Sequence, residues 1–215
     1  MNTFKQFYTR NRLLSSLLYV LFYCIGFFYI ESLTPDSYHI IYTPLDSMIP
    51  FCEYFVIPYY LWFPYLIVGF LFLFFDNKKQ FDQLGFIVFS GMTIFLIVSF
   101  LYPNAQELRP DIVNINNIFT QLVSSLYSID TPTNIFPSIH VYDSIAIAVA
   151  LSKNNTLQKY RWLIYLSNLL AISIVLATVF IKQHSILDGI GAFIMYLFFY
   201  AIVYTKQSKQ DSAIK

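Results

Sequence analysis

Six apolar stretches, most of them near the length needed to cross a membrane, constrain the fold of this chain more than any other feature. They cover residues 13–30, 56–75, 83–102, 137–152, 162–181 and 186–204. A helix needs about 20 mostly apolar residues to span a bilayer. Only 12% of the 215 residues are charged, whereas an average soluble domain carries about 25%. The sequence therefore predicts an all-α integral membrane protein, a six-span helical bundle that forms a single domain over residues 1–215.

The first apolar stretch follows several basic residues and could be mistaken for a signal peptide. No pattern of small residues typical of a cleavage site follows it near 27–31, so we predict an uncleaved first span. The two cysteines, Cys24 and Cys52, lie in an apolar stretch and in a loop. We therefore expect neither a disulfide bond nor a cysteine metal site.

The distribution of basic residues predicts how the chain is oriented. If the N-terminus is cytoplasmic and the six spans alternate, 11 of the 13 basic residues fall on the cytoplasmic side. These are Lys5, Arg10, Arg12, Lys78, Lys79, Lys153, Lys159, Arg161, Lys206, Lys209 and Lys215. The two exceptions, Arg109 and Lys182, fall on the outer side, as do all three histidines. We predict cytoplasmic termini and an anion site at the outer face.

His184 and Asp188 are the strongest candidates for catalytic side chains. They stand four residues apart at the outer end of an apolar stretch, so one helical turn places both on the same face. A carboxylate in this position can accept the proton on Nδ1 of the imidazole and leave Nε2 free to attack. The alternative is a polar pair that closes a helix end. Because ionisable groups are costly in so apolar a chain, we favour the functional interpretation.

A second group of candidate residues begins the fourth apolar stretch, in the sequence Phe136-Pro137-Ser138-Ile139-His140. Proline suits the first turn of a helix, and the amides there, together with the Ser138 hydroxyl, can bind an anion. His140 is placed to protonate a leaving oxygen. Taken alone, this group is more typical of a capped helix start with an incidental histidine, and only its place beside the His184 group favours the functional interpretation. Asp143 either orients His140 or makes a structural polar contact, and the sequence leaves both open.

Arg109 lies in the longest loop, 103–136, whose residues show little periodicity. The planar guanidinium group matches the oxygens of a phosphate, although a loop arginine can also face solvent or lipid headgroups. Lys182 could reach the membrane interface or join Arg109 on the same anion. The proline-broken segment 31–55 is predicted to lie at the membrane surface and to be partly helical.

Taken in order, the three groups resemble the signature of the type 2 phosphatidic acid phosphatase superfamily. That signature consists of K-x6-R-P, P-S-G-H and S-R-x5-H-x3-D blocks, and the matching positions lie within 102–188. The combination of all three blocks is specific, whereas any one of them is weak. The resemblance implies a helical membrane phosphatase or phosphotransferase that needs no metal and no other cofactor.

The resemblance also implies a role for each matching residue. Arg109 corresponds to the arginine that binds the phosphoryl oxygens, and Ser138 to the serine that donates to them. His140 corresponds to the general acid. His184 corresponds to the nucleophile that forms a phosphohistidine, and Asp188 to the carboxylate that orients this nucleophile.

Three blocks of the signature are altered in this chain. Tyr102 replaces the lysine of the first block, Ile139 replaces the glycine of the second, and Ala177-Thr178 replaces the Ser-Arg of the third. Lys182 can supply one of the two missing cations and is predicted to bind phosphate. The K-Q-H and P-S-x-H-V forms resemble the branch that includes inositol phosphorylceramide synthases and many short bacterial proteins, in which phosphotransferases and phosphatases both occur.

These observations predict a phosphoric ester hydrolase or phosphotransferase of lipid metabolism. We expect a multi-pass protein of the bacterial plasma membrane whose active site faces outward. Its partners would be a lipid phosphate or pyrophosphate and membrane lipids, with no nucleic acid; the oligomeric state is not indicated.

Two alternatives remain open. One is a zinc enzyme that uses His140, His184 and Asp188 as ligands, although no H-E-x-x-H motif is present. The other is a degenerate protein that binds lipid phosphate or assists transport without catalysis. The missing cations favour this second alternative, and the retained histidines and aspartate argue against it.

Overall fold

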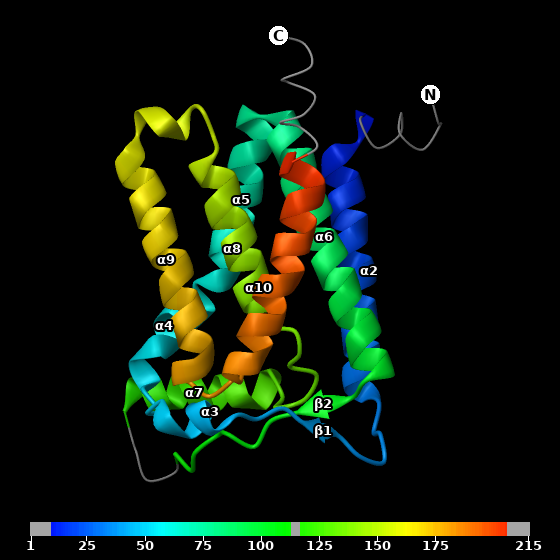
Figure 1. The fold of residues 1–215 in the computed structure, drawn as a ribbon, viewed down its shortest axis with the longest axis vertical. Helices are drawn as coiled ribbons and strands as arrows, with labels where there is room; N and C mark the ends of the chain where they lie inside the picture. Colours follow the sequence, from blue (N-terminus) through cyan, green and yellow to red (C-terminus); the bar gives the residue numbers. More distant parts are fainter. Residues whose placement is uncertain (1–9, 113–116, 206–215) are drawn as a thin grey trace.

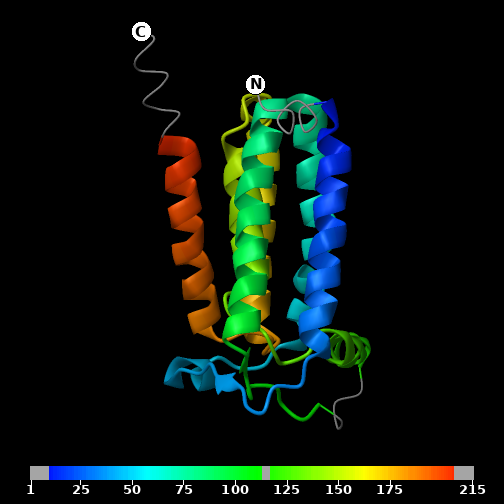
Figure 2. The same cartoon turned by 90° about the vertical axis from the view of Figure 1, so that its right-hand side faces the viewer.

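The computed structural model describes residues 10–112 and 117–205, and most of them lie in helices that run side by side (Figures 1 and 2). The long helices are α2 (Arg12–Ser32), α5 (Trp62–Asp76), α6 (Lys78–Leu101), α8 (Ile139–Ser152), α9 (Arg161–Phe180) and α10 (Ile186–Tyr200). The short helix α4 (Val56–Tyr60) leads into α5, and a π-helical turn, Ala201–Thr205, extends α10. The predicted all-α bundle is confirmed, and a helix occupies each of the six apolar stretches.

Within residues 10–112 and 117–205, five helical segments are long and apolar enough to cross a membrane, as expected of a multi-pass membrane protein. They are Arg12–Ser32, Glu53–Asp76, Lys78–Leu101, Arg161–Phe180 and Ile186–Thr205. The sixth helix, α8, has 14 residues and so measures about 21 Å, less than the roughly 30 Å of a bilayer core. It contacts α5, α6, α9 and α10 and is buried along nearly its whole length. It is the central helix, and its crossing of the membrane stays a prediction.

Glycines in two neighbouring helices let α8 reach the centre of the bundle. The Tyr142 ring lies directly against Gly91 of α6, where a Cβ atom would overlap it. The Tyr142 hydroxyl donates to the carbonyl of Ile87, also in α6, over 2.8 Å. On the α5 side, Ile147 packs against Gly69, and a Cβ there would approach Ile147 to 2.8 Å.

The second apolar stretch forms a helix with one break. A proline ring clashes with the carbonyl four residues earlier, and Pro64 accordingly follows the break between Tyr60, which ends α4, and Trp62, which begins α5. The Leu61 amide still donates to Ile57 (3.1 Å), so the two helices remain continuous. The residues on either side of this break face the candidate site.

Short elements cover one end of the bundle (Figures 1 and 2). Strand β1 (His39–Ile40) pairs in parallel with β2 (Asn104–Ala105), with His39 opposite Asn104. The segment 31–55 also contains α3 (Pro44–Met48) and the 3₁₀ turn η1 (Glu53–Phe55). The expectation that this segment is partly helical is confirmed.

The long loop is more regular than its sequence indicated. Helix α7 (Ile118–Ile129) lies across the same end of the bundle (Figure 1). The Asn117 side chain caps it by accepting the amides of residues 119 and 120, both over 2.9 Å. Apolar residues at 119, 122, 123 and 126 belong to one apolar cluster with residues of α4 and α9 and follow helical spacing. This short amphipathic pattern was the overlooked signal.

The opposite end of the bundle carries the turns that join α5 to α6 and α8 to α9, including the 3₁₀ turn η2 (Leu157–Lys159). The helices α2, α6 and α9 begin there with Arg12, Lys78 and Arg161. The basic residues assigned to the cytoplasm by sequence therefore gather at this end wherever the structure describes them. Lys5, Lys206, Lys209 and Lys215 lie outside the described residues.

We expect Gly91→Ala to destabilise the bundle by about 1–3 kcal/mol, because the new methyl group overpacks the site that holds the Tyr142 ring. The apparent Tm in detergent would fall. Gly85→Ala, in the same helix, is the matched control, because its Cβ would meet its nearest neighbour at an ordinary 3.6 Å. An equal loss of Tm in both variants would contradict this view of the α6–α8 contact.

Candidate active site

The turn between α9 and α10 places His184. The Thr178 carbonyl accepts the amides of Gln183 and His184, each over 3.0 Å. Lys182 takes a left-handed conformation with φ of 55°, which reverses the chain at this point. Ser185 then caps α10, and the Asp188 carboxylate accepts the Ser185 amide over 2.8 Å. This capping box fixes Asp188 on the side of the helix that faces His184.

The structure brings together the three residues that we predicted to be catalytic. Nδ1 of His184 lies 3.3 Å from Oδ2 of Asp188. On the other side of the ring, Nε2 of His184 lies 3.3 Å from Nδ1 of His140. All three residues are buried, with His140 and His184 only 8% and 6% exposed. The carboxylate is thus placed to hold the proton on Nδ1 and leave Nε2 with a free lone pair.

Two aromatic residues from the break between α4 and α5 enclose His140. The Trp62 and Tyr59 rings lie 4.3 and 4.5 Å from the imidazole, measured between ring centroids. The Tyr59 hydroxyl lies 3.4 Å from Nδ1 of His140. These contacts hold the imidazole with Nδ1 directed at His184.

The direct contact between the two histidines shows that the site is closed. A nucleophile approaches phosphorus at about 3 Å, and an acid holds the leaving oxygen at about 2.8 Å. Both cannot fit within the 3.3 Å that separates Nε2 of His184 from Nδ1 of His140. A phosphoryl group can enter between them only when the rings move apart.

Arg109 approaches this pair from the long loop. Its Nη1 donates to the carbonyl of Tyr127 (3.2 Å), and its Nη2 donates to the Asp130 carbonyl and to Oε1 of Gln183. The guanidinium also lies 4.2 Å over the Tyr127 ring. Burial lowers the pKa of Arg109, and the nearby Asp130 carboxylate opposes this shift. All of its hydrogen bonds go to neutral acceptors, and no carboxylate in the described chain lies within salt-bridge distance of it.

Asp130, which ends α7, links several of these residues. Its Oδ2 accepts the Tyr59 hydroxyl over 2.5 Å and the Gln183 side-chain amide over 2.9 Å. A continuous polar chain therefore runs from Arg109 through Gln183, Asp130 and Tyr59 to His140.

Ser138 and Lys182, the other two residues predicted to bind phosphate, form hydrogen bonds with protein groups in this closed site. Ser138 is fully buried; its hydroxyl caps α8 by accepting the Val141 amide (3.4 Å), and its own amide donates to the Asp188 carbonyl (3.2 Å). Nζ of Lys182 donates to the carbonyls of Asp46 and Ile49 (2.6 and 2.5 Å) and so points to α3. Burial lowers the pKa of Lys182, and the Asp46 carboxylate opposes this shift. Phosphate binding by either residue stays a prediction.

The residues that replace the missing cations make local contacts in the described chain. Tyr102 stacks on His39, with ring centroids 4.2 Å apart, and His39 takes no part in the contact between the other two histidines. Thr178 donates its hydroxyl to the Val175 carbonyl within α9. Asp143 makes no hydrogen bond to His140; neither of its carboxylate oxygens has a partner within the described residues.

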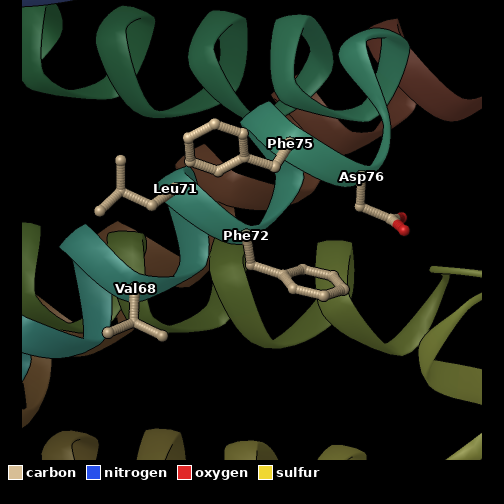
Figure 3. Close-up of a pocket in the computed structure, with 5 residues that line it drawn as sticks. All are labelled: Val68, Leu71, Phe72, Phe75 and Asp76. Carbon is tan, nitrogen blue, oxygen red and sulfur yellow. The ribbon is translucent and has the colours of Figure 1, made fainter.

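Figure 3 shows an open groove on the bundle surface. It is lined by Val68, Leu71, Phe72, Phe75 and Asp76, all from α5. Trp62, which touches His140, begins this helix, and Asp76 ends it, about 21 Å away along the helix axis. The groove therefore belongs to the lipid-facing side of α5 and to the opposite end of the bundle.

Residues 83–211 match the family model described as the PAP2 superfamily. The chain belongs to the PAP2 superfamily. The match contains all three motif blocks and leaves out α2, α3, α4 and α5. No curated protein and no solved structure matched the chain. Membership supports, in general terms, a phosphatase-type activity on lipid phosphates in this helical membrane protein.

The structure adds five residues to the site of this PAP2 protein that the sequence analysis did not select: Asp46, Tyr59, Trp62, Asp130 and Gln183. Gln183 could have been found from its place beside His184. The others lie in the segments 31–55, 56–75 and 103–136, where no motif marks them. Within the described residues, no three His, Cys, Asp or Glu side chains are arranged to hold a metal ion.

Asp46 fastens the segment 31–55 to the His184 turn. Its carboxylate accepts the Ser185 hydroxyl (2.7 Å) and the amides of Ile186 and Thr43 (both 2.8 Å). Because Ser185 follows His184 directly, α3 stabilises the turn that carries the candidate nucleophile.

We expect Asp46→Ala to lower the free energy of unfolding by about 1–3 kcal/mol, because three donors lose a charged acceptor. Thermal unfolding in detergent would show the loss, and hydrogen exchange would quicken at the amides of 183–186. Asp36→Ala removes an exposed carboxylate from the same segment and serves as the control. Unchanged exchange at the His184 turn in Asp46→Ala would show that α3 does not hold it.

Proposed function

We propose that this protein is a lipid phosphatase or phosphotransferase that works through a phosphohistidine on His184. The observation that carries the proposal is the geometry around one imidazole: Asp188 faces Nδ1 at 3.3 Å, and Nε2 faces His140. This is the arrangement that an activated histidine nucleophile and an opposed general acid require.

The reaction proceeds in two steps. Nε2 of His184 attacks phosphorus, the bond from phosphorus to the leaving oxygen breaks, and Nδ1 of His140 gives its proton to that oxygen. His140 then removes a proton from the acceptor, whose oxygen displaces His184 from phosphorus. With water as acceptor the protein is a phosphatase; with a lipid or polyol hydroxyl it is a phosphotransferase.

Arg109 supplies the positive charge that the phosphoryl group needs. Phosphoryl transfer depends mainly on positioning and on stabilisation of the equatorial oxygens. Arg109 is bonded to the residue beside His184, and no carboxylate of the described residues forms a salt bridge with it. We assign it to the phosphoryl oxygens, with Ser138 and Lys182 joining when the closed site opens.

Positively charged residues support an outward-facing site in the plasma membrane. The basic helix ends gather at the end of the bundle opposite the histidines, and basic residues favour the cytoplasmic side. The K-Q-H and P-S-x-H-V forms favour the branch with inositol phosphorylceramide synthases and short bacterial proteins. The tails of the substrate, acyl or prenyl, would contact the aromatic-rich helices.

We expect the purified protein in detergent to release phosphate from phosphatidic acid, phosphatidylglycerophosphate or a prenyl pyrophosphate, with EDTA causing no loss. His184→Ala would lower the rate by about 1,000-fold or more, because it removes the nucleophile. Its matched control is His39→Ala, which removes the exposed histidine that stacks on Tyr102. Labelled substrate would leave acid-labile, base-stable phosphate on the wild type and none on His184→Ala.

The other outcomes separate the alternatives. Activity lost with EDTA and restored by zinc would favour the metalloenzyme. Headgroup transfer to an added alcohol without phosphate release would identify a phosphotransferase. Neither release, transfer nor phosphoenzyme would leave a protein that binds lipid phosphate without catalysis.

We expect a cysteine at Ser128, at the site end, to react with an impermeant maleimide in intact cells. A cysteine at Asn155, at the other end, would react only after lysis. Both positions are exposed, and both variants would be made with Cys24→Ala and Cys52→Ser. The reverse pattern of labelling would place the site in the cytoplasm.

A further inference from the structure

We propose that Tyr59 and Asp130 act as a positioning pair that keeps the proton of His140 on Nδ1, and that Gln183 couples this pair to Arg109. The inference rests on the proposed function, because it concerns the proton that the general acid delivers. It follows from counting donors and acceptors around one nitrogen atom.

The Tyr59 hydroxyl has one proton to give, and it gives that proton to Asp130. The donor and acceptor oxygens are only 2.5 Å apart, which is typical of a strong, charge-assisted hydrogen bond. The Tyr59 oxygen therefore presents only lone pairs to Nδ1 of His140, 3.4 Å away.

The second neighbour of this nitrogen also lacks a proton. In a neutral imidazole, one nitrogen is a donor and the other an acceptor. Nδ1 of His184 faces the Asp188 carboxylate, so it carries the proton, and Nε2 of His184 is the acceptor. Nδ1 of His140, which faces this acceptor and the Tyr59 oxygen, must itself be the donor.

The position of this proton suits the chemistry. Nδ1 is the atom of His140 that faces the nucleophile, so a phosphorus atom placed between the rings would have its leaving oxygen on the His140 side. The Trp62 and Tyr59 rings hold the imidazole in this orientation. Without the Tyr59 oxygen, only the contact with His184 would favour the Nδ1 proton, and a substrate between the rings removes that contact.

Gln183 connects this arrangement to the phosphate-binding arginine. Its amide nitrogen donates to the same Asp130 oxygen that holds Tyr59 (2.9 Å), while its amide oxygen accepts from Arg109. An anion on Arg109 therefore acts on the hydrogen bonds that set the protonation of His140.

The ionisable groups near His140 come from several elements. They are Tyr59 on α4, Arg109 in the long loop, Asp130 after α7, Asp143 on α8 itself, His184 in the turn and Asp188 on α10. A purely structural role for the Tyr59–Asp130 hydrogen bond, which also docks α4 against the end of α7, is the competing explanation. The experiments must measure something that docking alone would not change.

The first experiment reads the position of the proton directly. The chain contains only three histidines, so ¹⁵N-histidine labelling gives few signals, assigned with His39→Ala and His184→Ala. We expect His140 to carry its proton on Nδ1 in the wild type and to shift toward the Nε2-protonated form in Tyr59→Phe, which keeps the ring but loses the hydroxyl. Tyr65→Phe is the matched control, because Tyr65 is also buried and bonded through its hydroxyl, to Ser167 (2.8 Å). Identical His140 signals in Tyr59→Phe and wild type would overturn the proposal.

The second experiment compares two leaving groups in the first half-reaction, phosphoenzyme formation. Tyr59→Phe and Asp130→Asn should slow it by about 10- to 100-fold for a lipid phosphate, whose alkoxide needs a proton. They should slow it by less than about threefold for a nitrophenyl ester, whose leaving group needs none, with KM little changed and Tyr65→Phe unaffected. Equal losses on both substrates would mean a structural role and overturn the pair. A wild type inactive on both substrates would overturn the proposed function instead, while the proton measurement would still decide the pair.

Discussion

The N-terminus of α10 is the point on which the site depends. Here one carboxylate oxygen of Asp188 accepts the Ser185 amide and also lies within hydrogen-bond distance of His184 Nδ1. The same carboxylate ends the turn, caps a membrane-length helix and faces Nδ1 of His184, so that Nε2 faces His140. In an apolar environment, such helix-end donors must find partners within the protein. The capping of α10 and the orientation of His184, the candidate nucleophile, therefore depend on the same hydrogen bonds.

Segments distant in the sequence converge on this helix end. Asp46 of α3 holds Ser185 from one side, and the Ser138 amide reaches the Asp188 carbonyl from another. Tyr59 and Trp62, which lie on either side of the break between α4 and α5, enclose His140. Asp130 and Arg109 come from the long loop, whose helix α7 packs on α4 and on the turn η1. The short elements at this end thus supply hydrogen-bond partners for polar groups that find none on the apolar helices.

The contact between His140 and His184 lies where the proposed substrate would enter, so the hydrogen bonds that hold the two residues affect how the site can open. A phosphoryl group does not fit between the rings, so the proposed function requires that substrate binding separate them. His140 is enclosed by two aromatic rings, whereas His184 stands in a turn held by hydrogen bonds to Thr178 and, through Ser185, to Asp46. The turn is therefore the part whose hydrogen bonds would have to adjust when the site opens.

The sequence alone determined the class of fold, since apolar stretches of membrane length leave a helical bundle as the solution, and it located the candidate catalytic residues. His184 and Asp188 were recognised because both lie within one helical turn, and His140 because a helix start precedes it. Helix α7 was missed because its apolar pattern is short. Tyr59 and Asp130 could not be paired from sequence, since 71 residues separate them and no local rule links them.

The tertiary structure also decided which groups Lys182 contacts in the described chain, where its amine donates to the carbonyls of Asp46 and Ile49. Its place beside Arg109 on one anion stays a prediction. Local spacing thus determined which residues can share a helix face, because that depends only on backbone geometry. Which polar groups meet across the bundle was decided by how the helices and end segments pack, because each buried donor there must find an acceptor from another element.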